Sequence, residues 1–305
     1  METIFEILKA ILFGIVEGIT EWLPISSTGH LILLETVMKF TDVSDGFWEM
    51  FEVVIQLGAI LAVVVLFWNI IWPFGLSKNV HDFFSDNGDK RFWKQKNWIV
   101  GPFAVKMDII INWLKVVVAC IPAILFVILG FDEICEEYFY NAMGVSIALI
   151  AFGVAFIVIE NRNIGKRAKA EEMFQITWTM AALIGIFQLL AAAFPGTSRS
   201  GATILGALLI GVSRKAASEF TFILAIPVMF GASLLKLLDF GFDLSGTEWA
   251  ILLSGMLTAF LVSIIVIKFL LSYIRKHDFK VFGWYRIVLG AFVLLCGVAG
   301  VIQLF

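Results

Sequence analysis

The chain has 305 residues, of which 60% are hydrophobic and 15% are charged, and its mean hydropathy is +0.96. A chain of this composition could not surround one packed core with a mostly polar surface, so we expect an integral membrane protein. The net charge of −3 and the lack of a basic tail exclude nucleic acid as an expected partner. The three cysteines form no CxxC pair, so neither a disulfide framework nor a zinc site is expected.

Apolar runs without strict alternation predict an all-α fold with about six full transmembrane helices of about 20 residues each. The predicted spans are residues 50–72, 113–131, 140–160, 216–238, 249–272 and 284–304. Segments 1–40 and 173–213 are also apolar, but each has a short second arm, 30–38 and 202–212, that could not cross a bilayer. Each segment therefore predicts a re-entrant hairpin.

The connections between these segments divide by charge. Four of them hold 15 of the 22 Lys and Arg residues, and three hold none. The basic set is 73–112, 160–172, 212–216 and 272–283, and the set without Lys or Arg is 40–49, 131–141 and 239–249. By the positive-inside rule the basic set is cytoplasmic, which places both chain termini outside. The two hairpins are then expected to enter the membrane from opposite faces.

A weak internal repeat agrees with this topology. The 17 residues from Gly14 and the 17 from Gly185 share four identities. The matched pairs are Gly14 with Gly185, Ile15 with Ile186, Pro24 with Pro195 and Ser27 with Ser198, and Glu17 falls on Gln188. We predict one membrane domain, 1–305, built from inverted-topology repeats 1–160 and 173–305, each a hairpin followed by three spans. Such repeats place a ligand site where their broken helices meet, so both hairpin tips are expected to form one site.

The first tip combines carboxylates, hydroxyls and an imidazole. Glu17 and Glu21 lie one helical turn apart in an apolar segment, which is typical of cation binding but also compatible with helix packing or snorkelling. With no basic residue beside them, they favour a hard divalent cation, Mg²⁺ or Ca²⁺. Pro24 breaks the helix, and the polar residues that follow are Ser26, Ser27, Thr28, Gly29 and His30. The hydroxyls either only cap the next helix or act together with His30, which titrates near neutral pH.

The second tip runs from residue 195 to residue 201, is rich in glycine and opens a short helix. Backbone amides at a helix start, together with a guanidinium, are typical of a phosphate site. The candidate residues here are Gly196, Ser198, Arg199, Ser200 and Gly201, and those in the first tip are Ser26 and Thr28. The alternative is that Arg199 only neutralises the two glutamates.

Five other residues are weaker candidates. Glu52 and Gln56 either line the site or lie at the membrane interface. His81 and His277 are expected at the surface, and Pro227 is expected to kink its span.

The motifs EGITEWLPISSTGH (17–30) and PGTSRSGAT (195–203) closely resemble the two signature motifs of the bacterial undecaprenyl-diphosphatase family, also called bacitracin-resistance proteins. The repeat layout extends the resemblance over nearly the whole chain, although segment 73–112 is longer than the family usually carries. The resemblance implies hydrolysis of undecaprenyl diphosphate at the outer face of the bacterial plasma membrane, which recycles a lipid carrier for cell-wall synthesis and confers bacitracin resistance. By position it implies an acidic motif at Glu17 and Glu21, a Ser/His element at Ser27 and His30, and a phosphate-binding element at Ser198, Arg199 and Thr203.

The chemistry of the residues in the two tips and the family resemblance lead to the same hypothesis for the mechanism. Glu17 and Glu21 hold a divalent cation on the diphosphate, and Arg199 stabilises the transferring phosphoryl group. Ser27 with His30 as base, His30 itself, or water activated by His30 makes the attack. The competing hypothesis is a polyprenyl-phosphate transporter, because inverted repeats with opposed hairpins are a transporter architecture. The expected partners are the polyprenyl diphosphate and the bilayer, and a homodimer is a candidate assembly.

Overall fold

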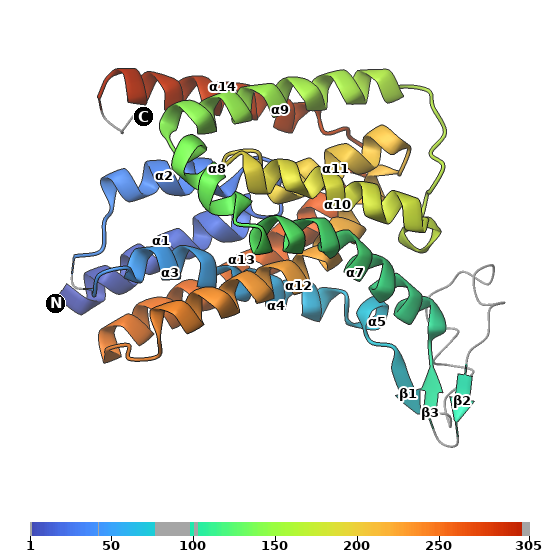
Figure 1. The fold of residues 1–305 in the computed structure, drawn as a ribbon, viewed down its shortest axis with the longest axis horizontal. Coiled ribbons are helices and arrows are strands. Elements are labelled where there is room, and N and C mark those ends of the chain that lie inside the picture. The colour runs from blue at the N-terminus through green and yellow to red at the C-terminus, as the bar shows by residue number, and fades with distance from the viewer. Residues whose placement is uncertain (1, 42, 77–97, 101–102, 301–305) are drawn as a thin grey trace.

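The computed structural model describes residues 2–41, 43–76, 98–100 and 103–300 and shows a bundle of helices that run along its longest dimension (Figure 1). Within these residues, six helices are long and apolar enough to cross a membrane, which confirms the six predicted spans. They are α3–α4 (Phe47–Val54 and Gln56–Leu66), α7 (Met107–Ile128), α9 (Ala142–Asn163), α12 (Arg214–Phe240), α13 (Gly246–Tyr273) and α14 (Lys280–Val298). A four-residue helix, α5 (Trp68–Ile71), extends the first span.

Two helical hairpins enter the bundle from opposite ends. The first consists of α1 (Glu2–Thr20) and α2 (Ser27–Val37), and the second of α10 (Trp178–Ala193) and α11 (Arg199–Ile210). In each hairpin the first helix runs to the middle of the bundle, and the second returns to the end from which the first came (Figure 1). The opposed re-entrant hairpins of the predicted fold class are therefore present. The division into repeats 1–160 and 173–305 stays a prediction.

The two tips break their helices in the same way. Of the described residues other than glycine, Ser26 and Ser198 have positive φ, 74° and 69°. Each is an N-cap whose hydroxyl accepts a hydrogen bond from the backbone N–H three residues later, of Gly29 at 3.4 Å and of Gly201 at 3.1 Å. A positive φ at a serine is costly, and it persists only where the surrounding structure fixes it, commonly at functional sites.

This geometry corrects two expectations from the sequence. The alignment paired Ser27 with Ser198, whereas the structure makes Ser26 the counterpart of Ser198, because the second tip has one more residue between its proline and its cap. The second arm of the first hairpin was predicted over 30–38, but α2 begins at Ser27. The Ser26 cap satisfies the first turn, so the helix can start three residues earlier.

Small residues let the first arm of each hairpin pack closely on a span from the other half of the chain. A Cβ atom on Gly14 of α1 would lie 2.5 Å from the carbonyl oxygen of Gly255 in α13. One on Gly185 of α10 would lie 2.3 Å from the carbonyl oxygen of Ala119 in α7. The two aligned glycines therefore serve the same purpose, because the absence of a side chain lets helix backbones approach each other within a membrane.

We expect Gly185→Ala to destabilise the protein by about 1–3 kcal/mol, because the added methyl group meets backbone atoms that cannot move aside. Gly231→Ala in α12 is the control, since a Cβ there meets no atom within 4 Å and alanine is the better helix former. Thermal unfolding in detergent should give a lower midpoint for the first variant and an unchanged or higher midpoint for the second. Equal midpoints would contradict the close α10–α7 contact.

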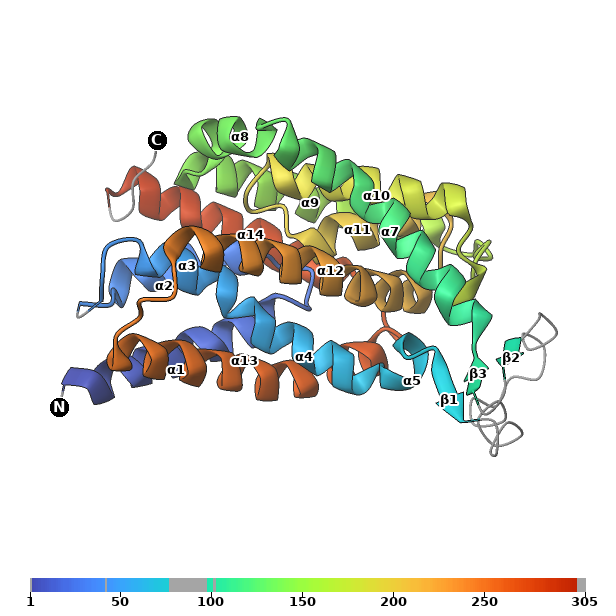
Figure 2. The same ribbon diagram turned by 60° about the horizontal axis from the view of Figure 1, so that its bottom comes forward.

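The basic connections gather at one end of the bundle. The described connections α9–α10, α11–α12 and α13–α14 lie there together with a small sheet, and α1 begins and α14 ends at the other end (Figures 1 and 2). The sheet, in the order β1-β3-β2, is antiparallel and consists of β1 (Phe74–Leu76), β2 (Trp98–Val100) and β3 (Phe103–Val105). It lies in the segment predicted as cytoplasmic, so the all-α prediction holds for the membrane part of the fold. Much of that segment, including His81, lies outside the described residues.

Two short helices lie in the connections. The predicted outer connection 131–141 contains α8 (Phe131–Phe139), and a 3₁₀ turn, η2 (Met173–Gln175), precedes α10. The largest apolar cluster extends through several helices and includes Trp22 and Ile25 of the first tip. The fully buried Trp22 packs edge-on against Phe222 of α12 at a centroid distance of 5.2 Å. The tip is thereby fixed against a span of the other half.

Candidate active site

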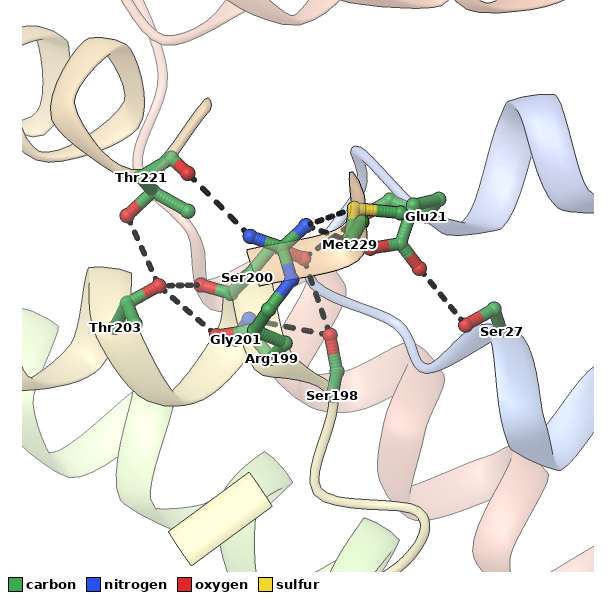
Figure 3. A network of polar contacts seen from close by, with 9 residues as sticks. All are labelled: Glu21, Ser27, Ser198, Arg199, Ser200, Gly201, Thr203, Thr221 and Met229. Atoms are coloured by element: carbon green, nitrogen blue, oxygen red, sulfur yellow. Dashed lines mark hydrogen bonds and ion pairs between the residues drawn. The ribbon is translucent and has the colours of Figure 1, made fainter. Parts of the chain in front are cut away.

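Glu21 is the residue at which the two tips meet. Its Oε1 accepts a hydrogen bond from Nη2 of Arg199 at 2.7 Å, and its Oε2 accepts one from Oγ of Ser27 at 3.0 Å (Figure 3). Its backbone oxygen accepts a third from Oγ of Ser200 at 2.9 Å. Glu21 is 7% exposed, so little water screens the ion pair. The predicted meeting of both motifs is therefore present in the structure.

Glu17 lies one turn earlier on α1 and is completely buried. Neither of its carboxylate oxygens has a hydrogen-bond partner among the described residues. A buried carboxylate without a partner is costly and is expected to bind a cation or a proton. The described residues contain no group of three or more His, Cys, Asp or Glu side chains that could hold a metal. Two carboxylates nevertheless fit Mg²⁺, which commonly takes one or two from the protein and its other oxygen ligands from water and phosphate.

Arg199 is the first residue of α11 and is held from two sides. Besides the bond to Glu21, its Nη2 donates to the sulfur of Met229 at 3.1 Å and its Nη1 to the backbone oxygen of Thr221 at 3.4 Å (Figure 3). Ser27 and Arg199, each the residue after its cap serine, thus approach the same carboxylate from opposite tips.

His30 is oriented by two contacts. Its Nδ1 lies 2.6 Å from the backbone oxygen of Ser26, and its Nε2 lies 2.7 Å from the hydroxyl of Tyr285 in α14. A carbonyl oxygen can only accept, so Nδ1 carries the hydrogen, and in the neutral ring Nε2 accepts from Tyr285. The His30 and Tyr285 rings are nearly parallel, at 6°. Within the described residues no hydrogen bond joins His30 to Ser27, whose hydroxyl donates to Glu21 instead.

Most of the other predicted phosphate-binding residues form hydrogen bonds that stabilise the backbone conformation of the tips. Ser26 and Ser198 are caps, and Ser200 binds the backbone of Glu21. Thr203 is fully buried, donates to the backbone oxygen of Arg199 at 2.9 Å and accepts from the hydroxyl of Thr221 at 3.0 Å. Thr28 is half-buried. Contact between these residues and a phosphate stays a prediction.

Arg286 of α14 was missed by the sequence reasoning. It is fully buried, and its guanidinium donates to backbone oxygens of both tips. The acceptors are Pro24 in the first tip, at 3.2 Å, and Gly196 and Thr197 in the second, at 3.0 and 2.7 Å. The signal in the sequence was one arginine inside a predicted span, where an ionisable residue is by default a functional candidate.

Of the weaker candidates, Glu52 of α3 lies near enough to Glu17 for the two carboxylates to repel each other. Glu52 accepts a hydrogen bond from the hydroxyl of Tyr140 at 3.2 Å. His277 is exposed, as expected, and stacks on Tyr273 at a centroid distance of 4.3 Å. Pro227 lies inside α12, which continues through it to Phe240.

The fold and the site together define a multi-pass membrane protein with an acidic site inside the bundle, at the contact of two re-entrant hairpins. The chain belongs to the bacitracin resistance protein BacA family, whose family model matches residues 10–292. It is 57% identical over 290 residues to a protein of Desulfitobacterium hafniense named undecaprenyl-diphosphatase, with 95% of each chain covered. It is 55% identical to undecaprenyl-diphosphatase 1 of Clostridium acetobutylicum, with 95% of this chain and 97% of the relative covered. An Enterococcus faecalis protein named undecaprenyl-diphosphatase is 53% identical, with 95% and 96% covered. The family inferred from the two motifs is confirmed.

Proposed function

We propose that the chain hydrolyses undecaprenyl diphosphate to undecaprenyl phosphate and inorganic phosphate in the bacterial plasma membrane. The reaction recycles the lipid carrier for cell-wall synthesis and supports bacitracin resistance. The observation that carries the proposal is the Glu21 carboxylate, bound by Arg199 of one tip and Ser27 of the other at 2.7 and 3.0 Å. The printed names of the relatives, which cover nearly the whole chain, support the same reaction.

The charge of the diphosphate is offset from two directions. Glu17 and Glu21 would hold a divalent cation, Mg²⁺ or Ca²⁺, which when bound neutralises charge on phosphate oxygens. The two carboxylate oxygens of Glu17 have no partner among the described residues and are therefore available as cation ligands. Arg199 and the first amides of α11 provide donors for the transferring phosphoryl group.

The Ser27 hydroxyl is the proposed nucleophile. It already donates to Glu21, so the carboxylate can accept its proton as the Ser27 oxygen attacks the terminal phosphorus. The bond from that phosphorus to the bridging oxygen breaks, and undecaprenyl phosphate leaves. Water then attacks the phosphoserine, and its proton passes through the Tyr285 hydroxyl to Nε2 of His30, the nitrogen to which that hydroxyl donates. The phosphorus–Oγ bond breaks, Glu21 returns its proton to the Ser27 oxygen, and inorganic phosphate leaves. Direct attack by His30, or by water that His30 activates, is the alternative route, and it would leave Ser27→Ala active.

Tyr285→Phe should lower kcat about fivefold, because loss of one hydrogen bond of about 1 kcal/mol leaves Nε2 of His30 unoriented. Tyr273→Phe is the matched control, since Tyr273 stacks on His277 outside the site. Steady-state phosphate release over a pH series should show an altered profile for the first variant alone. Identical profiles would mean that Tyr285 does not act through His30.

The orientation of the chain is also part of the proposal. The basic end of the bundle lies in the cytoplasm, both termini lie outside, and the site opens to the extracytoplasmic side. In a background in which the free cysteines Cys120, Cys135 and Cys296 are replaced by alanine, a membrane-impermeant thiol reagent applied to intact cells should label a cysteine introduced at position 45. It should not label one introduced at position 276. The reverse pattern would reject the orientation. A homodimer stays a prediction.

The direct test of the function is phosphate release from a C55 prenyl diphosphate by the purified protein in detergent. We expect release with Mg²⁺ or Ca²⁺, loss of release with EDTA, and loss in Glu21→Ala. Release that persists in EDTA would reject the cation. No release from folded protein would make the polyprenyl-phosphate transporter the better hypothesis.

A further inference from the structure

A polar cavity of about 490 Å³, separate from the site between the tips, lies at the basic end of the bundle. It is bounded by the last turn of α9 with the connection that follows, the end of α11 and the start of α12, elements that lie together in both views (Figures 1 and 2). None of its lining residues belongs to the site between the tips. One acidic residue, Glu160, lines it together with six basic residues, Arg162, Lys166, Arg167, Lys169, Arg214 and Lys215.

Only part of this positive charge is compensated within the described residues. Glu160 is buried and forms an ion pair with Arg214, whose Nη2 donates to Oε2 at 2.6 Å and whose Nε donates to Oε1 at 2.9 Å. Arg167 and Lys215 pair with glutamates outside the cavity. Arg162, Lys166 and Lys169 are exposed and form no ion pair with a described residue. The cavity therefore has three cations available for an anion.

The backbone brings one of these cations close to the end of α11. Gly211, with φ +96°, ends α11 and accepts a hydrogen bond from the backbone N–H of Lys169 at 2.8 Å. A Cβ on Gly211 would lie 3.2 Å from the side-chain methylenes of Lys169, so the lysine stem packs over the glycine. The Lys169 stem is thus held against the cavity wall.

Part of the cavity lining is apolar. Leu208, Leu209 and Ile210 of α11 and Ile274 after α13 line it, and Leu209 is 42% exposed. A soluble anion would gain no stabilisation from these apolar residues. A lipid, by contrast, can place its head group among the cations and its chains along the apolar helix surface. We propose that this cavity binds the phosphate group of an anionic membrane lipid.

The test measures binding of a short-chain phosphatidylglycerol to the full-length protein in a non-ionic detergent, for instance by native mass spectrometry. Phosphatidylcholine and inorganic phosphate are the comparison ligands. Each basic residue near an anionic head group contributes about 1 kcal/mol, so Lys166→Ala/Lys169→Ala should weaken binding roughly 30-fold. The matched control, Arg275→Ala/Lys276→Ala, removes two exposed charges from the same end but outside the cavity and should change binding less than twofold.

Three outcomes would overturn the proposal. Equal phosphatidylglycerol binding by the native protein and the cavity variant would reject the site. Equal weakening in both double variants would mean attraction to surface charge. Inorganic phosphate that binds as tightly as the lipid and displaces it would mean a site for free phosphate. The substituted lysines form no ion pair with a described residue, so the cavity variant should unfold at the native temperature, and phosphate release does not enter the test.

Discussion

Arg199→Lys is expected to lower the rate of phosphate release about 10²–10³-fold while the protein unfolds near its native temperature. Lysine keeps the positive charge beside Glu21 but has one ammonium group, whereas the guanidinium of Arg199 reaches Glu21 and α12 at the same time. A transferring phosphoryl group develops charge over several oxygens, which a fork of donors matches better than a point charge.

This substitution separates the two roles considered for Arg199. If it only neutralised the glutamates, lysine would serve and phosphate release would stay near the native rate, which would reject the contact with the phosphoryl group. Arg199→Ala is less informative, because it leaves Glu21 buried without its cation and lowers stability as well. Arg214→Lys is the matched control, since Arg214 binds Glu160 with equally short contacts outside the site and its replacement should not change kcat.

Hydropathy and charge were sufficient to predict the spans and both hairpins. A bilayer admits few backbone arrangements, so a segment such as 202–212 that is apolar but too short to cross can only turn back. The same reasoning required Glu21 and Arg199 to meet, because each would otherwise be an isolated charge at membrane depth. These predictions succeeded because a bilayer tolerates neither a broken helix that faces lipid nor an isolated charge.

Predictions about local backbone geometry were less successful. Identities in the sequence paired Ser27 with Ser198, but the cap geometry pairs Ser26 with Ser198, since a one-residue difference between the tips is invisible in an ungapped alignment. The contact of His30 with Tyr285 joins residues 255 positions apart and depends on how α14 packs. No local pattern in the sequence reports such a contact.

Arg286→Met is expected to lower both the unfolding temperature and kcat, although Arg286 contacts neither Glu17 nor Glu21 in the hydrogen bonds described above. The substitution leaves three backbone oxygens of the tips, those of Pro24, Gly196 and Thr197, buried without their donors. Each unsatisfied buried acceptor costs about 1–3 kcal/mol, so the loss of stability should reach about 3 kcal/mol or more. Because the same guanidinium binds both tips, misplacement by about 1 Å should lower kcat about 10²-fold.

The decisive measurement for Arg286 is hydrogen–deuterium exchange of peptides that cover 24–30 and 195–201. We expect both peptides to exchange faster in Arg286→Met than in the native protein, while the α7–α10 contact exchanges at its native rate. Arg286→Lys should lie between them, because its single ammonium can keep the charge but cannot reach all three carbonyl oxygens. Faster exchange at one tip alone would mean that the arginine supports that tip and does not join the two. Unchanged exchange at both, with kcat still reduced, would mean that Arg286 acts on the substrate through its charge and not by positioning the tips.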